Sequence, residues 1–352
     1  MIGFPFDAVL FDLDGTLVAT DGFWPDVARS ATLRFFGERG ITREVPGAPE
    51  WMRMVGLPID QAFDLTFADL DAATRADLLA ACMEEEHAQL ARDGAALLPG
   101  VAETLTDLAE QDVRLGIASN CAPEYLELML HRAGLARWIE EGRCLASPGV
   151  RDKADMIEDL LHTFGTRSAV MVGDRPGDRD AAWENGLPHV HIPRGYGGAE
   201  DDVEAEAVLA GMEQLVPACL RRETALDALF QRVEGADQVL VAGLPFAGAS
   251  QIIADLHGGG TVLVDPVLPI HELPLDDDDV AVPAGSALVA VVADEAVLER
   301  RARGQRVGLG PLERLSETLG AARARLAGLP VAVTLDNSNA LAPLLDGRTP
   351  GE

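Results

Sequence analysis

The stretch Ala8-Val9-Leu10-Phe11-Asp12-Leu13-Asp14-Gly15-Thr16-Leu17 decides the fold of this chain. Its apolar beginning, residues 8–11, predicts a strand that is buried on both faces, as strands of parallel sheets are. The strand ends in two carboxylates, Asp12 and Asp14, and a glycine turn. Open α/β sheets bind their ligands at the carboxyl ends of their strands, so we expect the chemistry of this protein at this position.

Two carboxylates at a strand end can divide one reaction between them, because the chain turns there and their side chains diverge. One can attack phosphorus while the other protonates the leaving group, as phosphoryl transfer through an aspartyl-phosphate requires. Residues 12–16, Asp-Leu-Asp-Gly-Thr, resemble the first signature of the haloacid dehalogenase superfamily, whose members are mostly phosphatases. Taken alone, the motif also describes an acidic turn between a strand and a helix.

Two further segments resemble the second and third signatures of this superfamily. Ser119 and Asn120 follow a predicted strand over residues 113–118, although Ser-Asn alone is also an ordinary turn signal. Lys153 stands at the start of a predicted helix over residues 154–164. It is the only lysine among 28 basic residues, which disfavours its interpretation as an ordinary surface lysine.

The fourth signature is resembled by Gly173-Asp174-x-x-x-Asp178, which follows a predicted buried strand over residues 169–172 and leads into a helix. The resemblance therefore covers about residues 5 to 220, with its four motifs in order. It implies an α/β fold with a Rossmann-like, doubly wound parallel sheet.

The resemblance also implies a role for each motif. Asp12 would be the nucleophile, and Asp14 the acid and base at the leaving oxygen. Ser119 and Lys153 would hold the phosphoryl group. The implied catalytic residues are Asp12, Asp14, Ser119 and Lys153, and the implied Mg²⁺ ligands are Asp12, Asp14, Asp174 and Asp178. The second acid favours a phosphatase or phosphomutase over a dehalogenase, because a halide leaves without a proton.

Residues 18–97 predict helices and resemble the type-one cap of this superfamily, which closes over the active site. Arg53 lies in a turn of this cap, and we predict that Arg53 and Asn120 bind the substrate, with Trp24 and Trp51 as further candidates. A solvated arginine at a helix end is the alternative for Arg53. The cap contains no lysine, which disfavours a phosphonatase and weighs against a phosphomutase.

Composition limits the partners of the chain. Its 352 residues are 48% hydrophobic with no apolar run long enough to span a bilayer, so we expect a cytoplasmic protein. The four cysteines show no metal-site spacing, which favours reduced thiols. A net charge of −30 argues against nucleic acid and membrane partners and favours a small phosphate ester, held by a metal ion and a few cations. The oligomeric state is left open.

The C-terminal third, residues 221–352, is predicted to form a second α/β domain. Gly243-Leu-Pro-Phe-Ala-Gly248-Ala249-Ser250 follows a predicted strand over residues 238–242 and resembles the phosphate loop of nucleotide kinases, with Ala249 in place of lysine. Gly243, Gly248 and Ser250 are therefore candidate nucleotide-binding residues of a degenerate P-loop kinase-like domain. Packing between domains, oligomerisation and nucleotide sensing are its alternative roles.

These observations predict a catalytic core over residues 1–17 and 98–220, a helical cap over residues 18–97, and a P-loop-like domain over residues 221–352. The predicted enzyme is a Mg²⁺-dependent phosphatase that hydrolyses a small-molecule phosphomonoester through an aspartyl-phosphate. The alternatives are a nucleotide-responsive regulatory protein, a bifunctional phosphatase and kinase, and a phosphomutase.

Overall fold

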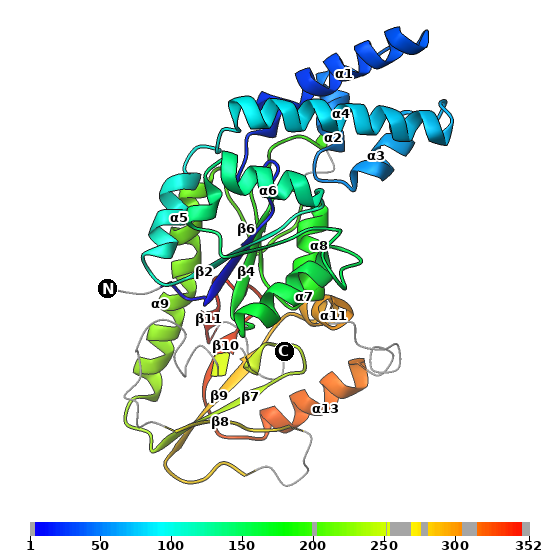
Figure 1. The fold of residues 1–352 in the computed structure, drawn as a ribbon. Coiled ribbons are helices and arrows are strands. Elements are labelled where there is room, and N and C mark those ends of the chain that lie inside the picture. Colours follow the sequence, from blue (N-terminus) through cyan, green and yellow to red (C-terminus); the bar gives the residue numbers. More distant parts are fainter. Residues whose placement is uncertain are drawn as a thin grey trace.

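The computed structural model describes residues 4–198, 203–250, 252–253, 269–275, 281–304 and 315–346. These residues form three stacked units (Figure 1). A helical unit lies at the top of the view, a first sheet with its helices lies in the middle, and a second sheet lies below it. Within the described residues, every helix is too short or too polar to cross a bilayer.

The first sheet has six parallel strands in the order β3-β2-β1-β4-β5-β6. The first strand lies inside the sheet, because β1 pairs with β2 on one side and with β4 on the other. The predicted Rossmann-like parallel sheet is thereby confirmed. Its strands are β1 (Ala8–Phe11), β2 (Arg114–Ala118), β3 (Glu141–Arg143), β4 (Ala169–Gly173), β5 (His189–His191) and β6 (Ala207–Val208).

Alternate residues of β1 point into two separate apolar cores. Val9 and Phe11 belong to one core, whereas Ala8 and Leu10 belong to the other, and all four side chains are fully buried. This two-sided burial explains why the strand is an unbroken apolar run rather than an alternating one. The helices that cover this sheet are α5 (Val101–Ala109), α6 (Pro123–Arg132), α7 (Lys153–Phe164) and α8 (Pro176–Glu184), with the short η2 (Leu135–Arg137) after α6.

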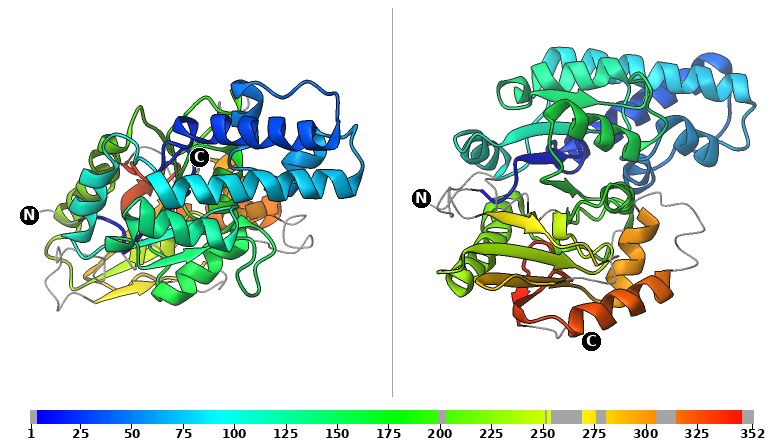
Figure 2. Two further views of the ribbon diagram at one scale, coloured as in Figure 1. Left: turned by 45° about the horizontal axis from the view of Figure 1, so that its top comes forward. Right: turned by 90° about the horizontal axis from the view of Figure 1, so that it is seen from below.

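The helical unit follows β1. Helices α1 and α4 lie side by side, and two shorter helices pack near their far end (Figures 1 and 2). Trp51, Phe63 and Phe67 form its aromatic core, and Trp51 is fully buried. The connection between α2 and α3 spans residues 55–58, so Arg53, which was predicted to lie in this turn, instead lies in the last turn of α2. The elements are η1 (Thr20–Gly22), α1 (Trp24–Arg39), α2 (Ala48–Met54), α3 (Ile59–Thr66) and α4 (Ala72–Asp93).

The second sheet has the order β11-β10-β9-β7-β8, in which only β11 runs antiparallel to its neighbour. The C-terminal third thus contains a second α/β unit. The strand predicted at residues 261–265 and the acidic run at residues 276–279 lie outside the described residues. The elements are β7 (Gln238–Gly243), β8 (Ile270–Glu272), β9 (Ser286–Val292), α11 (Glu295–Gly304), α13 (Leu315–Ala327), β10 (Val331–Asp336) and β11 (Leu344–Leu345).

A single helix joins the two sheets. Helix α9 (Leu215–Val233), preceded by η4 (Met212–Gln214), runs along both of them in Figure 1. Its first half packs into the core of the first sheet through Leu215, and its second half packs into the core of the second through Leu226 and Leu229. The predicted boundary at residue 220 therefore falls inside one continuous helix.

Candidate active site

The first two carboxylates diverge because the chain turns sharply after β1. The amide of Asp12 donates to the carbonyl of Val172 on β4 at 2.9 Å, which continues the parallel pairing up to Asp12. Gly15 then adopts a φ of +84°, a conformation that favours glycine. A Cβ at this position would lie 2.5 Å from Oδ2 of Asp174, so the glycine also makes room for that carboxylate.

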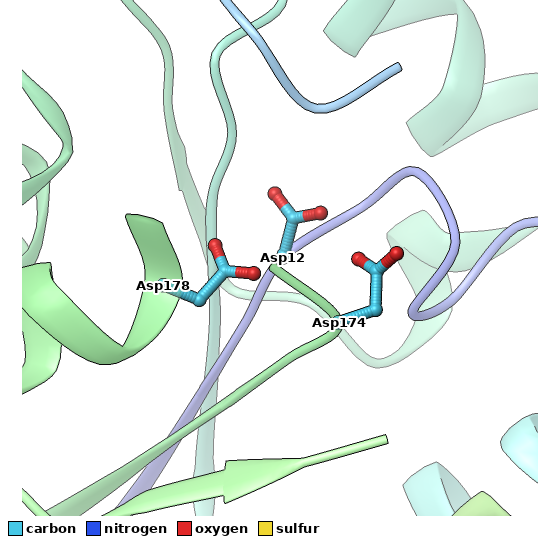
Figure 3. Close-up of side chains that lie close together, drawn as sticks. All are labelled: Asp12, Asp174 and Asp178. Atoms are coloured by element: carbon cyan, nitrogen blue, oxygen red, sulfur yellow. The ribbon is translucent and has the colours of Figure 1, made fainter. Parts of the chain in front are cut away.

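The second acidic pair comes from the junction of β4 and α8. Asp178 lies in the first turn of α8, and its Oδ2 accepts from the amide of Arg175 at 2.9 Å, which caps the helix. A Cβ at Gly173 would lie 2.3 Å from the same oxygen, so only glycine allows this close approach. Figure 3 shows the carboxylates of Asp12, Asp174 and Asp178 gathered around a common space.

Lys153 joins two of these carboxylates. Its Nζ donates to Oδ1 of Asp12 and to Oδ1 of Asp178, both at 2.6 Å, and all three side chains are buried. Burial acts to lower the pKa of Lys153, but the charges of the two aspartates outweigh it and raise that pKa above its ordinary value. The lysine is therefore a permanent cation between Asp12 and Asp178.

The acidic cluster fits a divalent cation. Asp12, Asp174 and Asp178 each offer a carboxylate oxygen within 4.8 Å of the others. Oδ2 of Asp12 and Oδ2 of Asp174 are buried without a hydrogen-bond partner in the structure. Burial raises the pKa of Asp12 to about 7, against the opposing effect of Lys153, and burial likewise raises the pKa of Asp174. Because hard oxygen ligands suit Mg²⁺, this donor set fits the predicted metal ion.

Asp14 has neutral partners instead of a cation. Its Oδ1 accepts from the hydroxyl of Thr20 at 2.7 Å and from the hydroxyl of Tyr125 at 2.6 Å. Burial raises the pKa of Asp14, and these two hydrogen bonds act in the opposite direction. A carboxyl group with a raised pKa is suited to hold a proton and deliver it to a leaving oxygen.

Replacing Tyr125 with phenylalanine removes one of the hydrogen bonds that stabilise the Asp14 carboxylate. We expect the pKa of Asp14 to rise further, so that the alkaline limb of the pH profile of kcat moves to higher pH, because the acid keeps its proton longer. The measurement is kcat between pH 5 and pH 10 for both proteins. An alkaline limb at unchanged pH would contradict this assignment of the acid.

Of the remaining predicted residues, Ser119 lies at the sheet edge of Asp12, whereas Asn120 and Arg53 have different surroundings. Ser119 follows β2 directly, is buried, and lies at the same edge of the sheet as Asp12. Asn120 instead contacts the helical unit, because its amide donates to the carbonyl of Gly56 at 3.0 Å. The side chain of Arg53 is exposed and does not line the cavity described below.

Arg175 fastens the connection between α2 and α3 to the core. Its guanidinium donates to the carbonyl of Val55 at 2.6 Å and to the carbonyl of Arg53 at 2.9 Å. Together with Asn120, it ties this part of the helical unit to the core. No sequence pattern indicated this role, because Arg175 occupies a position of the fourth motif that carries no residue signal of its own.

A cavity of about 80 Å³ lies between the helical unit and the core. The predicted candidate Trp24 lines this cavity. Asp14 shares it with Thr20, Tyr125 and Glu86, which no sequence pattern had marked as site residues. No local pattern marks these residues, because they come from separate elements. The lining residues are Asp14, Thr20, Trp24, Met54, Val55, Gly56, Leu57, Ile59, Met83, Glu86, Cys121, Ala122 and Tyr125.

The candidate nucleotide-binding residues lie elsewhere, between the two sheets. Gly243, Gly248 and Ser250 line a cleft whose other wall is the opposite end of the first sheet, around Ser168 and Gly186. Gly248 has a φ of +90°. The nucleotide-binding role of these residues stays a prediction.

Arg301 and Asn337 engage the carbonyls of the same loop. The Arg301 guanidinium donates to the carbonyls of Phe246 and Ala247, both at 3.3 Å, and the Asn337 amide donates to the carbonyl of Ala247 at 2.8 Å. The loop is therefore tied to α11 and to the end of β10 within this unit.

Residues 9–192 match the family described as haloacid dehalogenase-like hydrolase. The chain belongs to this family. The predicted enzyme class, a phosphoric monoester hydrolase of the haloacid dehalogenase type, is confirmed by this match together with the relatives described next.

The curated relatives match about three fifths of this chain. The phosphoglycolate phosphatase of Caulobacter vibrioides is 28% identical over 232 residues, covering 62% of this chain and 93% of the relative. That of Escherichia coli K12 is 24% identical over 237 residues, covering 60% and 91%. A solved structure described as a predicted phosphoglycolate phosphatase of Haemophilus somnus shares the fold, with a TM-score of 0.53 and 21% identity over 60% of this chain and 97% of its own.

Proposed function

We propose that this protein is a Mg²⁺-dependent phosphatase that hydrolyses a small phosphomonoester through an aspartyl-phosphate. The proposal rests mainly on the different surroundings of the two carboxylate oxygens of Asp12. One of its oxygens is paired with Lys153 at 2.6 Å, and the other is buried beside Asp174 without a partner. The Lys153 cation favours the ionised form of Asp12 against the effect of burial and orients the carboxylate, as a nucleophile requires.

In the proposed reaction, an oxygen of Asp12 attacks phosphorus and the bond between phosphorus and the leaving oxygen breaks. Asp14 gives its proton to that oxygen as it leaves. Asp14 then takes a proton from water, whose oxygen attacks the phosphorus of the aspartyl-phosphate and releases Asp12 and inorganic phosphate. Lys153 and the hydroxyl of Ser119 hold the phosphoryl oxygens, so positioning and charge supply most of the rate.

Mg²⁺ would be held by Asp12, Asp174 and Asp178 together with the backbone carbonyl of Asp14. When bound, it supplies positive charge to the phosphoryl group in a chain whose net charge is −30. The second acid, Asp14, also distinguishes a phosphatase from the dehalogenases of the same superfamily. Asp14 is buried and hydrogen-bonded beside the cavity, which favours a leaving group that needs a proton over a halide.

The proposal predicts phosphate release that requires a divalent cation. We expect the purified protein with Mg²⁺ to hydrolyse at least one member of a panel of small phosphate esters, including phosphoglycolate because the relatives bear that name. EDTA should abolish this release, and added Mg²⁺ should restore it. A folded protein that releases no phosphate from any ester, or releases it equally in EDTA, would contradict the proposal.

We further propose the three predicted units as domains, with the second boundary placed inside α9 rather than between separate helices. Helix α11 packs on α8, and the Arg300 guanidinium lies 3.7 Å from the ring centre of Trp183 while it pairs with Glu206. These contacts, together with the shared helix, support a C-terminal unit that is fixed to the catalytic core.

Charge at the phosphate-loop-like segment disfavours a nucleotide. Four carboxylate residues and one arginine line the described part of the cleft around it, and the lysine position of the loop is Ala249. The charged residues are Asp7, Glu158, Glu184, Glu272 and Arg167. A polyphosphate would meet net negative charge there.

We therefore expect 1 mM ATP or GTP with Mg²⁺ to leave the thermal midpoint unchanged. A dissociation constant of about 10 μM would stabilise the protein by about 2.7 kcal/mol and would be easy to detect. A rise in the midpoint that disappears in Ser250→Ala would contradict this expectation and support the kinase-like interpretation.

A further inference from the structure

The cavity beside Asp14 has an unusual charge balance for an enzyme that handles phosphate esters. Its walls are mostly apolar, with Trp24, Met54 and Ile59 among them. Its two ionisable carboxyl groups are Asp14 and Glu86, and none of the described residues that line it is lysine, arginine or histidine. The cation described for this site, Lys153, lies beside Asp12, where the phosphoryl group is proposed to bind.

Glu86 is the feature of this cavity that the proposed chemistry does not use. It projects from α4 of the cap, its exposed fraction is 9%, and it makes no hydrogen bond or ion pair with any residue that the structure describes. On the same helix, Glu85 pairs with Arg34 at 2.7 Å. A buried carboxylate is costly unless a partner reaches it, so the open cavity in front of Glu86 indicates a partner on the ligand.

We propose that Glu86 determines specificity by receiving an amino group of the substrate, so that the substrate class is the phosphate monoester of a small amino alcohol. This inference rests on the proposed function. The phosphate would lie at Asp12 and Lys153, the short carbon chain would pack on the apolar walls, and the ammonium group would donate hydrogen bonds to the Glu86 carboxylate.

Size and charge both support this class. One buried water needs roughly 10–15 Å³, so a cavity of about 80 Å³ accommodates about half a dozen non-hydrogen atoms, which matches the size of a small amino alcohol. An organic acid such as glycolate would add a further carboxylate beside Asp14 and Glu86. Burial and the charge of Asp14 already raise the pKa of Glu86, and a ligand cation would relieve that effect whereas a ligand anion would increase it.

The test compares three esters of nearly equal size: 2-aminoethyl phosphate, ethyl phosphate and phosphoglycolate. Their binding is measured by calorimetry with Mg²⁺ on an Asp12→Asn protein, and their turnover is measured on the wild type. We expect 2-aminoethyl phosphate to bind at least tenfold more tightly than ethyl phosphate and phosphoglycolate to bind most weakly. Glu86→Gln, made in the Asp12→Asn protein, should remove the preference for the amine.

Two further variants separate this role from a structural one. Glu84→Gln lies on an exposed position of the same helix and should keep the preference. Glu86→Asp keeps the charge and should keep the order of the three esters even where it lowers affinity. Equal binding of the three esters, tighter binding of phosphoglycolate, or an amine preference that survives in Glu86→Gln would each overturn the inference.

The same data distinguish the two proposals. Asp12-dependent hydrolysis of ethyl phosphate without any amine preference would overturn the role of Glu86 and leave the phosphatase in place. Amine-selective, Glu86-dependent binding without hydrolysis of any ester would support the role of Glu86 and overturn the phosphatase.

Discussion

The rate of phosphate release is expected to fall by roughly 10⁴-fold or more when Asp12 is replaced by asparagine, as rates do in other enzymes that lose their nucleophile. The amide cannot form the bond to phosphorus that the reaction requires. It also removes one charge from the cluster with Asp174 and Asp178, whose carboxylate oxygens lie within 4.8 Å of that of Asp12. The measurement is the rate of phosphate release with saturating Mg²⁺, on the ester that the wild type hydrolyses fastest.

The Asp12→Asn protein should remain folded. Asparagine has nearly the same shape, and its side-chain oxygen still accepts a hydrogen bond from Lys153. Asp107→Asn, at an exposed position on α5, provides the control and should retain full activity. Residual activity of Asp12→Asn above a few per cent would show that another group is the nucleophile.

The second large effect is expected on replacing Lys153 with methionine, which should destabilise the protein by about 3–5 kcal/mol as well as abolish activity. Methionine fills a similar volume but leaves the buried carboxylates of Asp12 and Asp178 without the cation that now lies 2.6 Å from each. Chemical denaturation in EDTA measures the loss. Mg²⁺ should then recover part of the stability, because it returns positive charge to the same cluster.

An exposed ion pair provides the comparison for this variant. Arg167 pairs with Glu158 at 3.1 Å, with more than half of each side chain exposed, and Arg167→Met should cost at most about 1 kcal/mol. Equal stability of Lys153→Met and Arg167→Met in EDTA would show that Lys153 does not stabilise the buried carboxylates of Asp12 and Asp178.

The sequence by itself determined those parts of the fold and site that depend on short-range patterns. The apolar run of β1 and the carboxylates after it are contiguous in the chain, and so are the residues of β4 and the acidic motif that begins α8. Parallel strands bring their carboxyl ends to one edge of a sheet, which is enough to predict that Asp12 and Asp174 lie close together. The place of Lys153 beside them was implied by the resemblance of its segment to the third signature. The structure places them together as expected.

Only the tertiary structure decided what surrounds Asp14 and how the helical unit is held on the core. Tyr125 reaches Asp14 from 111 residues away, and Arg175 reaches Val55 across 120 residues. Hydrophobic periodicity tells which face of a helix is buried but not what it is buried against, so neither contact has a local signal. Glu86 reads in the sequence as one more charge on a polar helix, and only the packing of the cap on the core turns it into a buried carboxylate that faces the cavity.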